Sequence, residues 1–305
     1  MTSINTNVSA MAALSTLRTI NNDMESTQSR ISSGLKVGQA SDNAAYWSIS
    51  TTIKSDNKAL ATVQDALGLG AAKTDVAYTA MDASIKVVDE IKSKLVAASE
   101  PGVDKAKVQK DITELQNQLK SIAKSAAFSG ENWVQGLSTA STKSIVGGFN
   151  RDSSNAVSLT TLDFDTSKSL LVEVDGSGNI ATGGTVGKLT TDITGLATAK
   201  SVLTLDISTL DTSELKIAIS GVDKVLQSMT DAGADLGALN KRITLQTDFV
   251  SDLTASFTKG VGRLVDADMN EESTRLKALQ TQQQLGIQSL SIANSDAQNI
   301  LSLFR

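Results

Sequence analysis

A hydrophobic residue recurs at every seventh position over a long stretch in the last third of the chain. Such spacing, sustained over several heptads, is the pattern of a coiled coil. Only one proline, Pro101, occurs in the 305 residues, so little interrupts long helices. The sequence therefore predicts a helical bundle whose seam is formed by Leu236, Leu239, Ile243, Val250, Leu253, Phe257 and Leu264, with Gln246 among them.

Heptad spacing also appears at both ends of the chain, over residues 10–35 and from about Glu271 onward. Polar residues interrupt both rows (Asn21 and Gln28; Gln280, Gln283 and Asn294), which weakens a coiled coil while selecting its register. One interpretation is an ordinary two-helix seam within a monomer. The other is that these arms become ordered only when many chains meet. The apolar last turn favours the second, because each buried side chain there is worth roughly 1.5–3 kcal/mol. The predicted subunit-packing residues are Leu14, Leu17, Met24, Ile31, Leu35, Leu276, Ile287, Leu290, Leu301 and Phe304.

Between the arms the pattern predicts a helical hairpin, a β-rich middle and a returning helix. The hairpin joins residues 76–98 to 108–122 through a turn at Pro101, with Asp104 as N-cap. From about 136 to 207 Ser, Thr and Gly dominate, and SLLVEVD-GSGN-IATGG indicates a strand, a turn and a returning strand. Asp211 and Glu214 have capping-box spacing at the start of the returning helix.

The fold class predicted is mainly α: a long helical coiled-coil or bundle rod formed by the N- and C-terminal regions, with a small central β-rich outer domain. We divide the chain into terminal arms (1–45 with 270–305), a helical bundle domain (46–140 with 208–269) and an outer domain (141–207). The outer domain shows no periodic seam, so we expect filaments to form even when residues 145–200 are deleted.

Composition argues against an enzyme or a nucleic-acid-binding protein. The chain has no histidine, the commonest general base and metal ligand, and its net charge is −5. GGTVGKLT fails as a phosphate loop because Leu189 follows the lysine, and EVDGSGN lacks the acidic ladder of a calcium loop. No signal peptide or membrane span is visible. We predict no catalytic, cofactor-binding or metal-binding residues, and assign a solvated structural role to the acidic pairs Asp89/Glu90, Asp163/Asp165 and Asp266/Asp268.

Motifs near both ends resemble those of bacterial flagellins. SRISSGLKVGQASDNAA (Ser29–Ala45) resembles the signature that follows the first arm. LGALNKR (Leu236–Arg242), VDADM and the closing SIANSDAQNILSLFR resemble the carboxy-terminal signatures, and INTN (Ile4–Asn7) fits the start. The resemblance covers roughly residues 1–135 and 210–305, and RISSGLKVGQASDNAAYWSIS is closest to the alphaproteobacterial type.

The resemblance implies a structural, non-enzymatic subunit of the motility filament. Terminal arms would line the central channel, and other copies of the chain would cover the apolar last turn. The implied partners are copies of the chain, the flagellar type III export apparatus, an export chaperone, and the filament cap and hook-junction proteins. Neither nucleic acid nor membrane insertion is implied. The implied location is the extracellular filament.

Two departures from the family pattern bear on immune recognition. Ser41-Asp42-Asn43-Ala44-Ala45 replaces the usual Lys-Asp-Asp-Ala-Ala, in a segment that plant immune receptors read in many flagellins. In VVDEIKSKL, Glu90 stands where flagellins sensed by the vertebrate Toll-like receptor carry a key arginine. The first departure alters the charge of that segment, and we expect the second to weaken activation of the vertebrate receptor.

Three alternatives have distinguishing features. A hook–filament junction protein would share the arms, but the LSLFR ending and the small central region favour flagellin. A flagellin with a metalloprotease insertion would need a His-Glu-x-x-His helix, and the chain has no histidine. A coiled-coil adhesin would use the β-rich middle to bind host surfaces, yet residues 136–210 show no defined ligand pocket in the sequence.

Overall fold

The computed structural model describes the backbone of residues 7–137, 141–196 and 198–302, and the side chains of these residues up to 295. The chain divides into two compact units, residues 1–58 with 254–305 and residues 59–253. Long helices occupy the terminal regions and short strands the centre, so the predicted fold class is confirmed.

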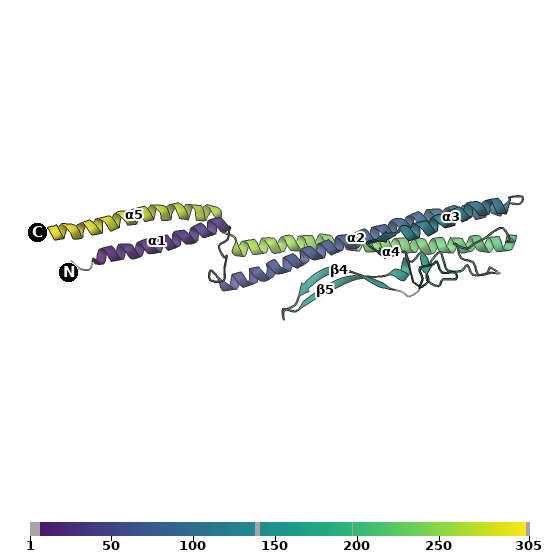
Figure 1. Ribbon diagram of the computed structural model, residues 1–305, viewed down its shortest axis with the longest axis horizontal. Helices are drawn as coiled ribbons and strands as arrows, with labels where there is room; N and C mark the ends of the chain where they lie inside the picture. Colours follow the sequence, from purple (N-terminus) through teal and green to yellow (C-terminus); the bar gives the residue numbers. More distant parts are fainter. Residues whose placement is uncertain (1–6, 138–140, 197, 303–305) are drawn as a thin grey trace. The chain divides into compact units, whose positions relative to one another are not determined.

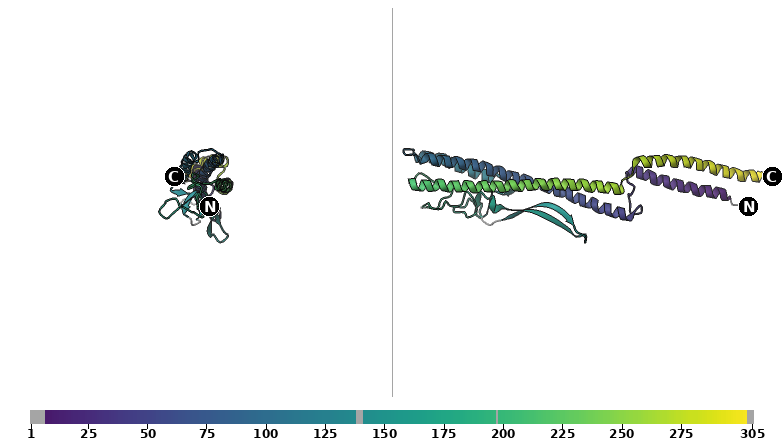
Figure 2. Two further views of the ribbon diagram at one scale, coloured as in Figure 1. Left: turned by 90° about the vertical axis from the view of Figure 1, so that its right-hand side faces the viewer. Right: turned by 180° about the vertical axis from the view of Figure 1, so that it is seen from behind.

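The first unit contains the helices α1 (Val8–Ser33) and α5 (Met269–Ser302), which run side by side in Figures 1 and 2. Gly34 ends α1 in the left-handed region (φ 72°), where glycine has no Cβ penalty. The chain after Gly34 then bonds to the end of α4 (Thr212–Val265): Lys36 N–H donates to Val265 O at 2.8 Å. A small core of Val37, Val261 and Val265 closes this junction, with Leu35, Ile53 and Leu264 packed against it.

The second unit is built on α3 (Lys105–Ser125), on α2 (Ala44–Ala98) from residue 59 onward, and on α4 up to residue 253. The Asp104 carboxylate accepts a hydrogen bond from Ala106 N–H, as predicted for the N-cap of α3. The capping box of α4 is also confirmed, because Glu214 N–H donates to the Asp211 carboxylate (2.7 Å) and Asp211 N–H to that of Glu214 (3.2 Å).

An antiparallel pairing joins α2 to α4 within the second unit. Lys92 Nζ lies 2.6 Å from Asp223 Oδ1, and farther along the pair Asn240 donates to Asp75. The fully buried core includes side chains from all three helices and from the middle of the chain: Leu67, Met81, Ile91, Leu95, Ile112, Leu119, Leu171, Leu189, Leu205, Ile207, Leu215 and Leu236.

The middle forms three two-stranded sheets, comprising β1 (Ala127–Phe128) with β2 (Glu131–Asn132), β3 (Gln135–Leu137) with β6 (Val172–Val174), and β4 (Thr142–Arg151) with β5 (Val157–Asp165). The β4–β5 hairpin lies beside α4 in Figure 1, and the Gln246 side chain donates to Gly147 O (2.7 Å) at its bulge. The predicted strand, turn and return after Leu171 is confirmed by the antiparallel bridge between Val174 and Ile180.

The parallel pairing of β3 with β6 was not predicted, since hairpins alone were expected in this region. The middle of the chain also packs against α3. The buried Gln116 amide donates to Val202 O and Leu205 O, both at 2.9 Å, and Gln109 Oε1 accepts from Ile207 N–H. Trp133 stacks on Phe164 with ring centroids 5.8 Å apart. The middle is therefore a packed part of the second unit.

Candidate interaction surface

The contact between α1 and α5 follows one heptad row on each helix. The buried and half-buried positions alternate in steps of three and four, which is the spacing of a two-helix seam. They are Ala10, Ala13, Leu17, Ile20, Met24, Thr27 and Ile31 on α1, and Glu272, Leu276, Leu279, Gln283, Gly286, Leu290 and Ala293 on α5.

Every second position of this row lies one residue before the position predicted from the sequence, for example Ala13 in place of Leu14. Leu14, Asn21 and Gln28 lie exposed beside the seam on α1, as do Gln280, Ile287 and Asn294 on α5. Small residues explain the shift, because they let the two helices approach closely. A Cβ added to Gly286 would lie 2.8 Å from Leu17 Cδ2.

Polar contacts tie the two helices in a single register. Arg30 Nη1 lies 3.3 Å from Glu272 Oε1, and the Gln283 amide donates to Asn21 Oδ1 at 2.7 Å. Asn7 serves both helices, because its Oδ1 caps α1 through Ala10 N–H while its Nδ2 donates to Ala293 O at 2.8 Å. The side-chain amide of Asn7 is thus engaged within the fold.

Breaking the Arg30–Glu272 pair on one side should destabilise the first unit. The Glu272 side chain is 9% exposed and its Oε2 already lacks a partner, so Arg30→Met leaves a buried carboxylate without its cation. We expect a loss of about 1–3 kcal/mol in denaturant unfolding followed by circular dichroism. Arg30→Met/Glu272→Met should recover most of it. Equal stability of the single variant and the wild type would contradict this role.

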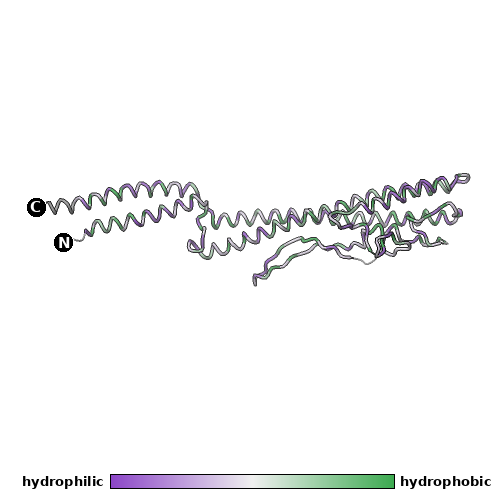
Figure 3. Tube along the Cα trace, in the orientation of Figure 1, coloured by the Kyte–Doolittle hydropathy of each residue, from purple (hydrophilic) through white to green (hydrophobic). Residues whose placement is uncertain are grey.

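Seven large apolar side chains in the described part of these helices are exposed, and one of them, Met269, lies at the first position of α5. The other six are Val8, Met11 and Leu14 on α1 and Leu285, Ile287 and Ile292 on α5, with exposed fractions between 41% (Leu14) and 67% (Val8). We call these six the exposed arm residues. Figure 3 shows hydrophobic and hydrophilic residues alternating along both helices. Burying each such side chain is worth roughly 1.5–3 kcal/mol, so the set is a candidate interaction surface.

The predicted subunit-packing residues fall into four groups. Leu17 is buried in the α1–α5 seam, and Met24, Ile31, Leu276 and Leu290 are half-buried there. Leu35 packs instead at the junction core. Leu14 and Ile287 are exposed, whereas the side chains of Leu301 and Phe304 lie outside the described residues. Sequence reasoning missed Val8, Met11, Leu285 and Ile292, whose only signal is an apolar residue on the polar side of an amphipathic helix.

The predicted bundle seam on α4 grades from buried to half-buried along the helix. Leu236, Leu239, Ile243 and Val250 are buried, and Leu253, Phe257 and Leu264 are half-buried. One further apolar pair on α4, Leu245 and Phe249, is 57% and 58% exposed and was missed because it falls outside the heptad row.

Three of the acidic residues singled out in the sequence, Asp163, Asp165 and Asp268, make local hydrogen bonds. Asp268 caps α5 by accepting from Asn270 N–H at 2.9 Å. Hydrogen bonds from Ser144 and Ser167 lower the pKa values of Asp163 and Asp165, which keeps both carboxylates ionised rather than poised as general acids. No group of three potential metal ligands occurs among the described residues, and none of the described helices combines the length and apolarity that a membrane crossing requires.

Comparison of the sequence with those of known proteins shows the family of the chain. Residues 4–139 match the bacterial flagellin N-terminal helical region, and residues 219–304 match the bacterial flagellin C-terminal helical region. Over the full length of both chains, the sequence is 54% identical to Flagellin C of Rhizobium meliloti (strain 1021) and 49% identical to Flagellin A of the same strain. It is 44% identical to a flagellin of Brucella melitensis biotype 1, again over the whole of both chains. The resemblance identified from the terminal motifs is confirmed, and the chain belongs to the bacterial flagellin family.

Proposed function

We propose that the exposed arm residues are the surface through which neighbouring subunits pack in the flagellar filament. As a flagellin, the chain is a structural subunit that polymerises into the bacterial flagellar filament used for motility, and it is not an enzyme. The observation that carries the proposal is the uncovered apolar set on α1 and α5, which one subunit cannot bury by itself.

The composition of the α1–α5 seam supports the proposal that the exposed arm residues become buried only when the subunits polymerise. The α1–α5 row contains Thr27, Gln283, Gly286 and several alanines, so pairing of the two helices buries little apolar area. Neighbouring copies would supply the missing burial through contacts between different faces, and such heterologous contacts extend indefinitely instead of closing. Within this proposal, residues 1–45 with 270–305 form the filament core, and Leu301 and Phe304 belong to the same packing surface. Residues 46–140 with 208–269 form a surrounding bundle, and 141–207 face outward.

The route to the filament is part of the same proposal. Flagellins form the extracellular filament. We place the flagellar type III export apparatus, an export chaperone, the filament cap and the hook-junction proteins among the partners of this chain. A chain without cysteine needs no disulfide to complete its fold after export.

A seeded assembly experiment tests the packing proposal. Purified full-length subunit is mixed with short filament seeds, and growth is followed by electron microscopy and sedimentation. We expect long filaments from wild-type subunit. Val8, Met11 and Leu14 should become protected from hydrogen exchange and surface labelling in the filament. Filaments in which these positions label as fast as in the monomer would overturn the proposal.

The exposed Glu90 on α2 leads to a prediction about innate immune sensing. Glu90 lies on a groove shared with Glu114 and with Asp111, which Lys94 pairs at 2.9 Å, so the charge left unpaired among these groove residues is negative where the receptor-binding pattern of flagellins calls for arginine. Like-charge juxtaposition opposes binding, so we expect weak activation of the vertebrate flagellin receptor in a reporter-cell assay. Glu90→Arg should raise potency, whereas Glu90→Gln should raise it less. Wild-type potency equal to that of a strongly sensed flagellin would refute this.

A further inference from the structure

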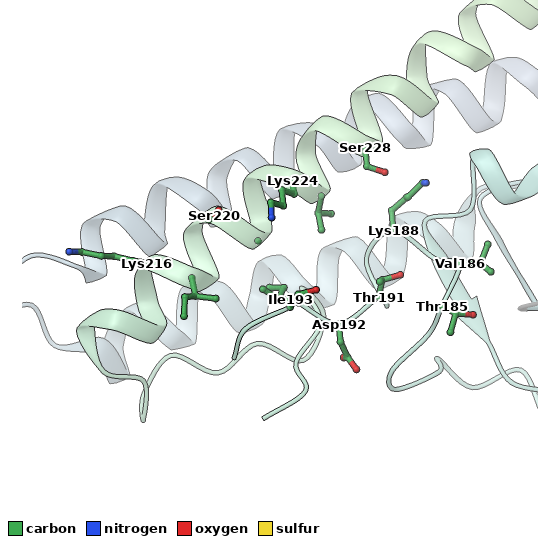
Figure 4. Close-up of a pocket in the computed structure, with 14 residues that line it drawn as sticks. Thr185, Val186, Lys188, Thr191, Asp192, Ile193, Lys216, Ser220, Lys224 and Ser228 are labelled. Carbon is green, nitrogen blue, oxygen red and sulfur yellow. The ribbon is translucent and has the colours of Figure 1, made fainter. Parts of the chain in front are cut away.

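A groove of about 640 Å³ lies between the beginning of α4 and the loop of residues 185–194, both within the second unit. Figure 4 shows Lys188 reaching from the loop side of this groove and Lys224 from the helix side, with Lys216 toward the start of the helix. The proposed packing of the arms makes no use of these residues.

The groove carries an excess of positive charge in an acidic protein. Three lysines line it (Lys188, Lys216 and Lys224) against one carboxylate (Asp192), whereas the whole chain has a net charge of −5. None of the three lysines forms an ion pair with another described residue. Lys216 and Lys224 are exposed and Lys188 is half-buried, so all three ammonium groups are available to an anion.

The rest of the lining combines hydroxyl groups with an apolar floor. Ile193 is 6% exposed, and it lies so close to the helix that a Cβ on Gly221 would approach its Cγ2 to 2.1 Å. Glycine at 221 therefore lets the loop sit directly against α4. The hydroxyl-bearing residues around this floor are Thr185, Thr191, Thr194, Ser220 and Ser228.

The loop side of the groove is held in place before any ligand arrives. The carboxylate of Glu173, a residue only 6% exposed, accepts from Thr185 N–H at 2.8 Å and Val186 N–H at 3.0 Å. Lys188 N–H donates to Leu170 O at 2.9 Å, which fixes the backbone that carries the Lys188 side chain. A preorganised site avoids the entropic cost of ordering a loop on binding.

The distance between the lysines of the groove favours an extended anion with several charges over a single small anion. Lys216 and Lys224 are eight residues apart, which corresponds to about 12 Å along a helix, so one small anion cannot contact both. Single-stranded nucleic acid relies on aromatic stacking platforms, and none of the described residues that line the groove is aromatic. Hydroxyl side chains both donate and accept hydrogen bonds, which matches the hydroxyl groups of sugars.

We propose that this groove binds an acidic polysaccharide, with the ammonium groups of Lys188, Lys216 and Lys224 on carboxylates of successive sugars and the Ser and Thr hydroxyls on the sugar hydroxyls. The apolar floor at Ile193 accepts the apolar face of a sugar ring. Since none of these residues belongs to the exposed arm residues, variants in the groove should polymerise normally.

Calorimetric titration of the full-length soluble subunit tests this assignment. The probes are hexagalacturonate, the neutral maltohexaose, a hexaglutamate peptide and inorganic phosphate. We expect hexagalacturonate to bind more tightly than the other three. Lys216→Gln and Lys224→Gln should each weaken it about tenfold, the loss of one charge-assisted hydrogen bond. Lys241→Gln/Lys259→Gln removes two exposed cations from α4 outside the groove and should leave the affinity unchanged.

A hydroxyl variant separates sugar recognition from charge recognition. Ser220→Ala removes the hydroxyl of an exposed groove residue on α4 and should weaken hexagalacturonate while leaving hexaglutamate unaffected. Circular dichroism establishes that each variant is folded. Because Lys216 is exposed, we expect Lys216→Gln to fold like the wild type. Hexaglutamate binding as tightly as the saccharide, an equal loss in the Lys241/Lys259 control, or no saccharide binding by the wild type would each overturn the proposal.

Discussion

Ile287→Asp is expected to raise the critical concentration for filament growth at least about 100-fold, with little change in the stability of the monomer. The Ile287 side chain is 56% exposed on α5, so in the free subunit an aspartate there stays in water. In the filament the same position would bury a carboxylate against a neighbour and lose the apolar burial of isoleucine. A penalty of about 2.7 kcal/mol already corresponds to a factor of 100, and burial of an unpaired charge costs several kcal/mol.

The measurements are sedimentation after seeding for assembly and thermal unfolding for the monomer. Surface substitutions usually change stability by no more than about 0.5 kcal/mol. Gln282→Asp is the matched control, because it adds the same charge at an exposed position on α5 about 140° around the helix from Ile287. If Ile287→Asp melts early, or if it assembles as well as Gln282→Asp does, the assignment of this face to subunit packing is wrong.

Deletion of residues 145–200 is expected to unfold the second unit, which reverses the expectation drawn from composition alone. The deleted segment contains apolar side chains that are no more than 7% exposed: Ile145, Leu162, Phe164, Leu170, Leu171, Val172, Leu189 and Ile193. At roughly 1.5–3 kcal/mol each, the burial of these eight side chains is worth about 12–24 kcal/mol, which is at least comparable with the entire net stability of a typical domain. Trp133 would also lose its stacking partner.

A short deletion at the tip of the β4–β5 hairpin provides the contrast. Asp152–Ala156 are all exposed and connect the paired residues Arg151 and Val157, so an Asn-Gly turn can replace them. We expect this variant to unfold at nearly the wild-type denaturant concentration and to form filaments. A folded, assembling 145–200 deletion would show that the buried residues of the middle contribute nothing to the bundle.

Local signals in the sequence predicted α1, α3, α4 and α5, the part of α2 from residue 76 to residue 98, the caps of α3 and α4, and the α4 seam. The helix α2 itself begins much earlier, at Ala44. Asp104, Asp211 and Glu214 were identifiable because capping depends on residues three positions apart or fewer. The α4 row was identifiable because its large apolar residues coincide with the contact positions, as at Leu236 and Ile243.

Contacts set by the approach of distant segments could not be predicted in the same way. On the arms the sequence favours Leu14 over Ala13 by size, whereas the two helices approach closely enough to select the smaller residue for the seam. The parallel pairing of Gln135 with Val172 and the groove at Lys188 depend on long-range packing, which no local period encodes. The exposed arm residues have the same explanation, since their partners lie outside the subunit in the proposed filament.

The tie between Asn7 and Ala293 has a consequence for the order in which the chain folds. These residues are separated by 286 positions, and Asn21 and Gln283 by 262, so nearly the whole chain must be present before α1 can find α5. Contacts of such high sequence separation form late and slowly, because closing the intervening loop costs entropy before any contact is gained. The amino-terminal arm therefore has no α5 to pair with until the carboxy-terminal arm has been synthesised.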